Sequence, residues 1–374
     1  IGDMAGDVFG NGLLMSDKLQ LVAAFNHLHI FIDPNPDTAS SFAERQRLFD
    51  LPRSSWADYD TKLISEGGGI FLRSAKSIAI SPQMKARFDI AADKLAPTEL
   101  LNALLKAPVD LLWNGGIGTY VKSSEESHAD VGDKANDALR VDGNELRCKV
   151  VGEGGNLGMT QLGRVEFGLN GGATNTDFID NAGGVDCSDH EVNIKILLNE
   201  VVQGGDMTEK QRNQLLPQMT DEVAALVLRN NYLQSLAISL TEAKGAGNRE
   251  ELSRLMDYLE GMGRLNRKVE RLPDSAAVAE RYVSGKALTR PEIGVLLSYA
   301  KIVLFDQLIE SDLPDDPYCE TTLANYFPAA MRKAFANDIA GHRLRREIIA
   351  TVLANHAINR GGPGFVVSVC DATG

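Results

Sequence analysis

The stretch Cys148-Lys149-Val150-Val151-Gly152-Glu153-Gly154-Gly155-Asn156 decides the fold that we expect for this chain of 374 residues. A short apolar run is followed at once by glycines and an amide side chain. Buried strands of parallel sheets have such apolar runs, and open α/β sheets bind ligands at the carboxyl ends of their strands. The stretch therefore predicts one strand of a parallel sheet, with a ligand-binding turn directly after it.

Other short apolar runs extend this pattern through the first half of the chain. They lie at Leu28–Ile32, Ser77–Ile80 and Val109–Trp113, with a weaker one at Asp177–Ile179. Amphipathic helical stretches at 13–26, 83–106 and 125–139 precede three of the strands. Strands that alternate with helices are typical of the α/β class, so we predict a Rossmann-like, doubly wound, mostly parallel sheet.

The second half of the chain predicts helices only. Apolar residues recur at helical spacing in 219–244, 252–259 and 342–359. Thr289-Arg290-Pro291-Glu292 is a capping box with proline in the first turn, and the apolar run 293–309 follows it. Gly204-Gly205 interrupts the helical pattern, so we predict a Rossmann-like α/β domain over 1–200 and an all-α C-terminal domain over 201–374.

The composition excludes several classes of protein. Hydrophobic residues make up 44% and charged residues 24%, which is ordinary for a globular chain and argues against disorder. A net charge of −13 disfavours nucleic acid as a partner, and the lack of an 18-residue apolar stretch disfavours a membrane span. The four cysteines are far apart, without the CxxC spacing of zinc sites, and the first residues do not resemble a signal peptide. We expect a cytoplasmic protein.

The opening segment suggests a phosphate-binding turn. Gly2, Gly6, Gly10 and Gly12 precede a helical run, and glycines let backbone amides approach a pyrophosphate. A flexible loop explains the same glycines equally well. Asp33 ends the run Leu28–Ile32, where an acidic residue would accept hydrogen bonds from an adenosine ribose and favour NAD over NADP; alternatively it starts a turn with Pro34.

Polar residues after the later strands are further candidates. Asn156 and Asn181 each follow a predicted strand and could bond a ribose or a carboxamide. Ser188, near the start of the next predicted helix, could bind a carboxylate together with backbone amides.

These residues carry a family resemblance. The segments Val151–Asn156 and Asn181–Glu191 resemble the nucleotide-binding domain of amino-acid dehydrogenases, glutamate dehydrogenases above all. Gly2–Gly12, Asn114–Thr119 and Leu288–Glu292 resemble the large bacterial NAD-dependent glutamate dehydrogenases. The similarity covers essentially the whole chain. It implies the C-terminal portion of a longer polypeptide, beginning inside the first nucleotide-binding strand.

The resemblance implies roles for individual residues. Gly2, Asp3, Met4, Ala5 and Gly6 would form the pyrophosphate turn, with Gly10-Asn11-Gly12 as a rival register; Asp33 would bind the adenosine ribose; Asn114 and Gly115 would lie beside the cofactor; Asn156 would face the nicotinamide ribose and Asn181 the carboxamide; Ser188 would bind the side-chain carboxylate of the substrate.

The same resemblance implies an activity that this chain cannot complete alone. The reaction would be oxidative deamination of L-glutamate to 2-oxoglutarate and ammonia, with hydride transfer to NAD, in a homo-oligomer. Its lysine and carboxylate would lie in a preceding substrate domain, because no Gly-Gly-x-Lys-x-Gly occurs here. We therefore expect no catalytic residue in this chain, and upstream domains of the same polypeptide as partners.

The sequence argues against other kinds of site chemistry and leaves two rival functions open. Cys187 and His190 lie on one helix without the convergence that a nucleophilic dyad needs, and neither H-E-x-x-H nor a P-loop is present, so we expect no metal site and no NTPase. A dehydrogenase of another amino acid, or a non-catalytic regulatory or assembly module, remains an alternative.

Overall fold

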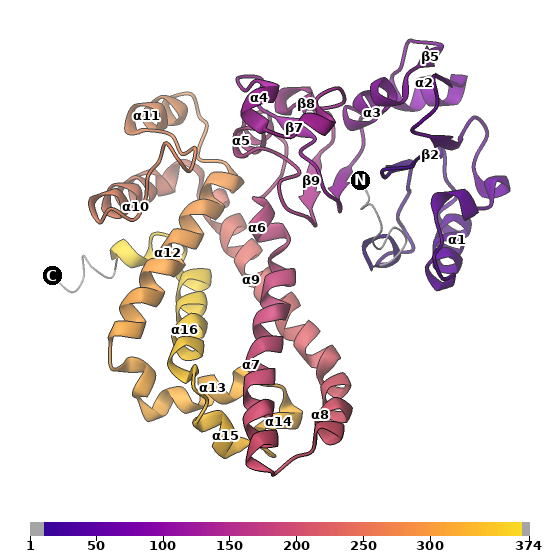
Figure 1. The fold of residues 1–374 in the computed structure, drawn as a ribbon. Helices are drawn as coiled ribbons and strands as arrows, with labels where there is room; N and C mark the ends of the chain where they lie inside the picture. The colour runs from indigo at the N-terminus through magenta and orange to yellow at the C-terminus, as the bar shows by residue number, and fades with distance from the viewer. Residues whose placement is uncertain (1–10, 369–374) are drawn as a thin grey trace. The chain divides into compact units, whose positions relative to one another are not determined.

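The computed structural model describes residues 11–368 (Figure 1). The chain divides into two compact units, Ile1–Asp177 and Phe178–Gly374. Strands lie in the first unit, whereas the described residues of the second form helices without a strand. The structure thus has an α/β part followed by a helical part, as predicted.

The strands of the first unit form four small sheets. Two sheets are antiparallel: β1 (Ala23–Phe25), β2 (His29–Ile32) and β3 (Gly69–Leu72) in that order, and β4 (Ile78–Ala79) with β5 (Lys94–Leu95). Two sheets are parallel: β6 (Leu111–Asn114) with β9 (Val150–Glu153), and β7 (Val121–Lys122) with β8 (Val141–Asp142). The four stronger apolar runs therefore do form strands.

A single doubly wound sheet is not present among residues 11–368, and the first connection explains part of the difference. The sequence predicts a helix over 13–26, but this stretch contains only the end of the 3₁₀ turn η1 (Asn11–Leu14) and then β1. The side-chain oxygen of Asn26 accepts hydrogen bonds from the backbone N–H groups of Leu28 (2.9 Å) and His29 (2.8 Å). This Asx turn reverses the chain, so β1 and β2 pair as an antiparallel hairpin.

The helices of the first unit are shorter than predicted. They are α1 (Thr38–Asp50), α2 (Pro82–Phe88), α3 (Pro97–Leu105), α4 (His128–Val131) and α5 (Gln161–Leu169), with 3₁₀ turns η2 (Trp56–Asp58), η3 (Thr61–Leu63), η4 (Lys134–Asn136) and η5 (Gly143–Glu145). The stretch 83–106 is divided because Asp89 adopts a left-handed C-cap (φ 59°) and Pro97 starts a new helix. Gly132 ends α4 in the same way (φ 76°), which shortens the helix predicted over 125–139.

The second unit is a bundle of helices. It comprises most of α6 (Asp177–Asp180), then α7 (Ala182–Gly204), α8 (Glu209–Leu215), α9 (Thr220–Ala243), α10 (Arg249–Gly261), α11 (Ser275–Val283), α12 (Arg290–Glu310), α13 (Glu320–Tyr326), α14 (Ala329–Arg332), α15 (Ala336–Ala340) and α16 (Arg345–Gly361), with 3₁₀ turns η6 (Leu216–Met219), η7 (Gly245–Asn248), η8 (Leu313–Asp315) and η9 (Pro317–Cys319). The weak strand predicted at Asp177–Ile179 is wrong, because these residues form α6. The capping box of α12 is confirmed, since Glu292 accepts from the backbone N–H of Thr289 at 2.7 Å.

The packing boundary at Asp177 precedes the division predicted at residue 200. The reason is α7, which runs unbroken from Ala182 to Gly204 and buries Ile194, Leu197 and Leu198 in a helical core. The chain therefore enters the helical unit before the glycine pair that suggested a boundary.

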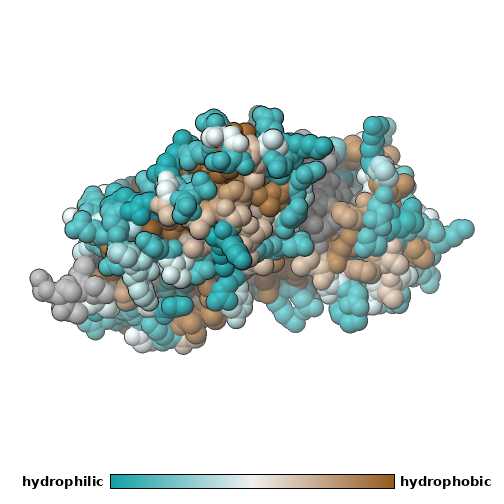
Figure 2. Space-filling view, turned by 90° about the horizontal axis from the view of Figure 1, so that it is seen from below, coloured by the Kyte–Doolittle hydropathy of each residue, from teal (hydrophilic) through white to brown (hydrophobic). Residues whose placement is uncertain are grey.

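The face shown in Figure 2 has hydrophilic areas interspersed with smaller hydrophobic ones. Within residues 11–368, no helix combines the length and the apolar character needed to cross a membrane.

We predict that Leu297→Ala lowers the free energy of unfolding by about 2–5 kcal/mol, because it leaves a cavity in a packed helical core. Leu297 lies in α12 and is 0% exposed, whereas Leu228 in α9 is 66% exposed. Urea unfolding followed by circular dichroism measures both. Leu228→Ala is the matched control, and an equal loss of stability in the two variants would contradict the assigned core.

Candidate functional site

The parallel pair of β6 and β9 sets two chain turns side by side. The two strands run in register from Leu111 opposite Val150 to Asn114 opposite Glu153, where both end. The segments that follow, 115–119 and 154–159, therefore leave the sheet from neighbouring positions at its carboxyl edge. In open α/β sheets this edge is where ligands bind.

The two turns also hold each other. The backbone N–H of Gly154 donates to the carbonyl of Asn114 at 2.8 Å, and the Thr119 hydroxyl donates to the carbonyl of Leu157 at 2.7 Å. Gly158 lies against the Asn114 side chain, so closely that a Cβ there would collide with its Nδ2 atom. Only glycine fits at this point, and the two turns form one packed structure.

Three of the predicted cofactor residues lie at or directly after the ends of β6 and β9. Asn114 is buried, its Oδ1 atom accepts from the backbone N–H of Gly116 at 3.4 Å, and its buried Nδ2 has no hydrogen-bond partner in the described part of the chain. Gly115 and Asn156 are exposed on the two turns. The site therefore offers exposed turn backbone, the exposed amide side chain of Asn156, and the buried Nδ2 donor of Asn114.

A buried ion pair between Arg164 and Glu153 holds the second turn in place. Arg164 of α5 binds Glu153, the last residue of β9, through two hydrogen bonds of 2.6 and 2.9 Å. The exposed fractions of the two side chains are 4% and 0%. Glu153 also accepts from the backbone N–H of Met159 at 3.0 Å, which ties both ends of the turn to one carboxylate. Burial raises the pKa of Glu153, against the opposing effect of the guanidinium.

Asp177 completes this support. Its Oδ2 atom accepts from the backbone N–H of Leu157 at 2.8 Å and lies 3.4 Å from Arg164 Nη2. Leu157 is held with a positive φ of 60°, a conformation that costs energy for a residue with a Cβ. The carboxylate therefore stabilises an uncommon backbone shape at the centre of the turn.

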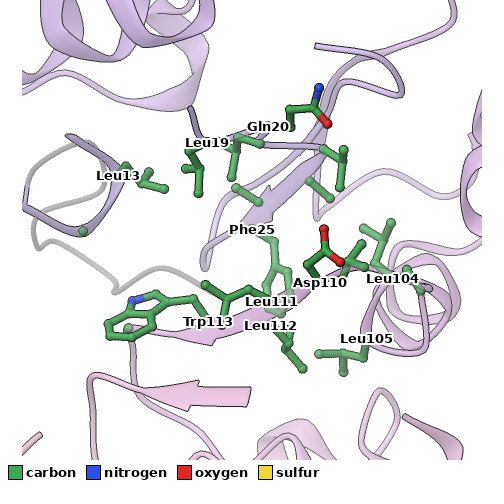
Figure 3. Close-up of a pocket in the computed structure, with 18 of the residues that line it drawn as sticks. Leu13, Leu19, Gln20, Phe25, Leu104, Leu105, Asp110, Leu111, Leu112 and Trp113 are labelled. Carbon is green, nitrogen blue, oxygen red and sulfur yellow. The ribbon is translucent and has the colours of Figure 1, made fainter. Parts of the chain in front are cut away.

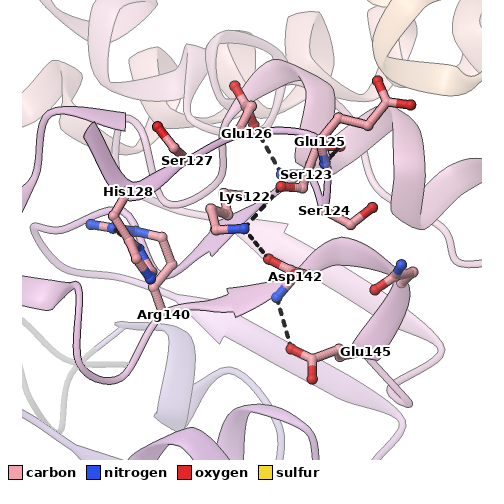
Figure 4. Close-up of polar contacts among 12 residues, drawn as sticks. Lys122, Ser123, Ser124, Glu125, Glu126, Ser127, His128, Arg140, Asp142 and Glu145 are labelled. Atoms are coloured by element: carbon pink, nitrogen blue, oxygen red, sulfur yellow. Dashed lines mark hydrogen bonds and ion pairs between the residues drawn. The ribbon is translucent and has the colours of Figure 1, made fainter. Parts of the chain in front are cut away.

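The first turn is held by a second polar network, part of which is drawn in Figure 4. Arg140, fully buried, donates through Nε to the carbonyl of Thr119 at 2.8 Å, while Asp133 accepts from the Thr119 N–H at 2.8 Å. Lys122 of β7 forms an ion pair with Asp142 of β8 and donates to the carbonyl of Ser123 at 3.1 Å. Through these contacts the Lys122 side chain stabilises the pairing of β7 with β8.

Asp33 directly follows β2, which belongs to a different sheet from β6 and β9. Its side chain is fully buried, and its Oδ1 atom accepts from both the hydroxyl and the backbone N–H of Ser65, the latter at 3.2 Å. Its Oδ2 atom is buried without a hydrogen-bond partner among residues 11–368. In the structure Asp33 therefore binds Ser65, and the contact of Asp33 with an adenosine ribose stays a prediction.

The remaining predicted residues are on α7 or outside the described range. Asn181 is the N-cap residue of α7, and it follows α6, not a strand. Ser188 is exposed in the second turn of α7, where its hydroxyl donates to the carbonyl of Gly184 at 3.2 Å. Both belong to the second unit. The predicted turn Gly2–Gly6 (Gly2, Asp3, Met4, Ala5, Gly6) and Gly10 of the rival turn lie outside the described residues.

Sequence reasoning missed the residues that support the turns. Glu153 stood inside the quoted motif without a role, and Arg164, Asp177 and Arg140 were not singled out. A buried arginine in the middle of an amphipathic helix leaves no periodic signal, because arginine is normal on the exposed face of such helices.

We predict that Arg164→Met destabilises the first unit by about 3–5 kcal/mol, because it leaves Glu153 as an uncompensated buried carboxylate. Thermal and urea unfolding measure the loss. The matched control is Lys149→Met, which breaks the exposed 2.7 Å ion pair with Asp110 and should leave stability unchanged within error. Equal effects of the two substitutions would show that the buried pair does not support the turn.

Comparison with known proteins places the chain in a family. The family described as "Bacterial NAD-glutamate dehydrogenase, catalytic domain" matches residues 1–241, and "Glutamate dehydrogenase, C-terminal" matches residues 285–374. Proteins named NAD-specific glutamate dehydrogenase are similar over the whole chain, with identities of 70% in Pseudomonas aeruginosa, 60% in Halomonas elongata and 49% in Mycobacterium tuberculosis. The chain spans 23% of the length of each of these relatives. The chain belongs to the bacterial NAD-glutamate dehydrogenase family.

Proposed function

We propose that this chain supplies the NAD-binding part and the C-terminal helical part of an enzyme that oxidises L-glutamate to 2-oxoglutarate and ammonia. The observation that carries the proposal is the pair of packed turns at the carboxyl edge of β6 and β9, in a chain of this family. The bound cofactor would accept the hydride, and the protein would orient it. Because this chain spans a minor share of its relatives, the proposal includes catalytic residues in the remaining polypeptide.

Asn114, Gly115 and Asn156 would hold the cofactor at this edge. The lack of a side chain at Gly115 lets a ligand approach the backbone, and the buried Asn114 Nδ2 atom is a donor that still lacks an acceptor in the described chain. Asn156 would face the nicotinamide ribose from the second turn. Gly2–Gly6 would bind the pyrophosphate, with Gly10–Gly12 as the rival position.

Asp33 would contact the adenosine ribose through its second carboxylate oxygen. That oxygen is buried, so the proposal requires the Ser65 segment to move or the ribose to enter beside it. A carboxylate there would disfavour the 2′-phosphate of NADP by charge repulsion.

The start of α7 would serve the substrate side of the reaction. Asn181 would bind the nicotinamide carboxamide, and the exposed Ser188 hydroxyl would bind the side-chain carboxylate of glutamate. A hydroxyl suits a carboxylate better than an apolar side chain, which favours glutamate over leucine or valine as the substrate. This assignment supports a functional division of 1–200 and 201–374, with the N-terminal turns of α7 serving the first domain. The proposal extends to a Rossmann-like sheet in the complete enzyme and to a cytoplasmic homo-oligomer.

We predict that the chain binds NAD and that Gly158→Ala weakens binding at least about tenfold, or ~1.4 kcal/mol. The added methyl group would displace the Asn114 side chain and separate the two turns. Isothermal titration at constant salt measures the dissociation constant. Gly247→Ala is the matched control, because a Cβ there meets no atom within 4 Å. Absence of heat with the unchanged chain at millimolar NAD would instead favour a regulatory or assembly module.

We predict that Asp33→Ala weakens NAD binding and reduces the preference for NAD over NADP. Ser65→Ala is the control, because it removes the hydroxyl bond to the carboxylate and leaves the carboxylate itself in place. Titrations of all three proteins with both cofactors give the preference. If Asp33→Ala loses stability to the same degree as Ser65→Ala with the preference unchanged, Asp33 holds the Ser65 segment and does not contact the ribose.

A further inference from the structure

Two pockets, one in each unit, differ in the charges that line them. The pocket of the first unit has a volume of about 680 Å³ (Figure 3) and adjoins the candidate site, since Gly115 is among its lining residues. Its charged groups have both signs, because Lys18, Arg87 and Asp110 all line it. The pocket of the second unit has a volume of about 500 Å³ and is lined by Leu353, His356, Ala357, Arg360, Gly361 and Phe365. Its ionisable groups are both basic, so its charge favours an anion.

One face of α16 and the turn after it form this second pocket, which we call the α16 pocket. Residues 353, 356, 357, 360 and 361 have the spacing of neighbours on one face of a helix. Gly362 ends the helix with a φ of 82°, and the backbone N–H of Phe365 donates to the Gly362 carbonyl at 3.2 Å. The turn brings the Phe365 ring back onto the helix, where a Cβ at Gly361 would lie 2.7 Å from it. The turn therefore sets the position of an aromatic wall.

The apolar surface of the α16 pocket belongs to well-packed parts of the helical unit. Leu353 packs against the buried cluster that contains Ile349, and Phe365 packs against the cluster that contains Ile358. The volume of the pocket lies within the range of roughly 300–1,000 Å³ that is typical of small-molecule sites. The pocket can therefore hold the apolar body of a small ligand against fixed walls.

Three exposed basic side chains gather at this pocket. His356 and Arg360 are one turn apart on α16, and Arg229 comes from α9, which packs against α16. Partial burial of the His356 ring lowers its pKa, and the charges of Arg360 and Arg229 lower it further. Within the described chain neither arginine forms an ion pair with a carboxylate. The positive charge at the pocket is therefore not neutralised by the residues around it.

The position of Arg360 alone has a simpler explanation. It lies in the last turn of α16, where a cation is stabilised by the helix dipole. That explanation does not extend to Arg229, which lies far from both ends of α9. In a chain with a net charge of −13, basic groups that act on one histidine without a nearby carboxylate are the feature that an anion-binding site requires.

We propose that the α16 pocket binds a small organic anion that consists of an apolar body and one charged group. The apolar body would lie against Phe365 and Leu353. The charged group would be held by Arg360, His356 and Arg229. A wholly apolar ligand would leave the basic groups without a counter-charge, and an inorganic anion would leave the apolar walls in contact with water. The inference is independent of the proposed cofactor, because none of these residues belongs to the candidate site.

Titration of the isotope-labelled 374-residue chain with benzenesulfonate, followed by NMR, tests the proposal without NAD. This probe joins a benzene ring to a charge that does not titrate near neutral pH. We expect saturable shifts of the backbone amides of His356, Arg360 and Phe365, with a dissociation constant of about 1–10 mM. Benzenesulfonamide carries the same ring without the charge, and it should bind at least about threefold more weakly.

Substitutions separate the charged and apolar parts of the site. Arg360→Gln should weaken benzenesulfonate binding about threefold to fivefold, the size expected of one exposed ion pair. Arg343→Gln is the matched control, because it removes an exposed arginine that does not line the pocket, and it should leave binding unchanged. Phe365→Leu removes the aromatic wall and should weaken the binding of both probes. Circular dichroism checks that each variant is folded.

Binding should also strengthen as the pH falls. A bound anion stabilises the protonated His356 ring, whose charge Arg360 and Arg229 oppose in the free protein. The affinity for benzenesulfonate should therefore rise about threefold from about pH 8 to about pH 5.5, and His356→Gln should abolish this rise. An equal rise in the variant would contradict the role of His356.

Two results would overturn the proposal as a whole. Equal affinities for benzenesulfonate and benzenesulfonamide would show that the pocket selects the ring without the charge. Unchanged binding in Arg360→Gln, or no shift of the three amides with the probe in excess, would show that the α16 pocket is not an anion site.

Discussion

The buried ion pair between Glu153 and Arg164 is the constraint on which the candidate site depends. Taking two charges out of water costs several kcal/mol for each ion, and the cost is offset only where hydrogen bonds satisfy both groups. Here the guanidinium contacts Glu153, Gln161 and Asp177, and Glu153 also accepts from Met159. The pair joins the end of β9 to α5, and the turn between them is thereby fixed at both ends.

Glu153 and Asp177 hold the second turn through backbone N–H groups, and Gly158 lets that turn pack directly on Asn114. The exposed backbone then remains in one shape before any ligand arrives. Such preorganisation lowers the ordering cost of binding, which is the physical reason to regard this edge as a cofactor site.

Part of the fold and of the site could be predicted from the sequence. The runs at Leu28–Ile32 and Val109–Trp113 contain strands, and the capping box at Thr289 begins a helix. Both signals lie within a short stretch of sequence, so they can be recognised without knowledge of the tertiary contacts. The direction in which strands pair can depend on single residues. Asn26 forms the turn that reverses the chain, so the stretch 13–26, whose apolar pattern resembles that of a helix, contains a strand of an antiparallel hairpin. That the turns after β6 and β9 leave the sheet side by side could be anticipated from parallel strand ends. The roles of Arg164 and Asp177 could not, because their contacts join segments that the sequence pattern does not relate.

We propose that the turns after β6 and β9 bind the nicotinamide dinucleotide. Hydrogen–deuterium exchange with and without saturating NAD tests this binding site. We expect slower exchange in peptides covering 114–119 and 154–159, with no change in peptides from α10. Saturable NAD binding that leaves both turns unprotected would instead place the cofactor elsewhere.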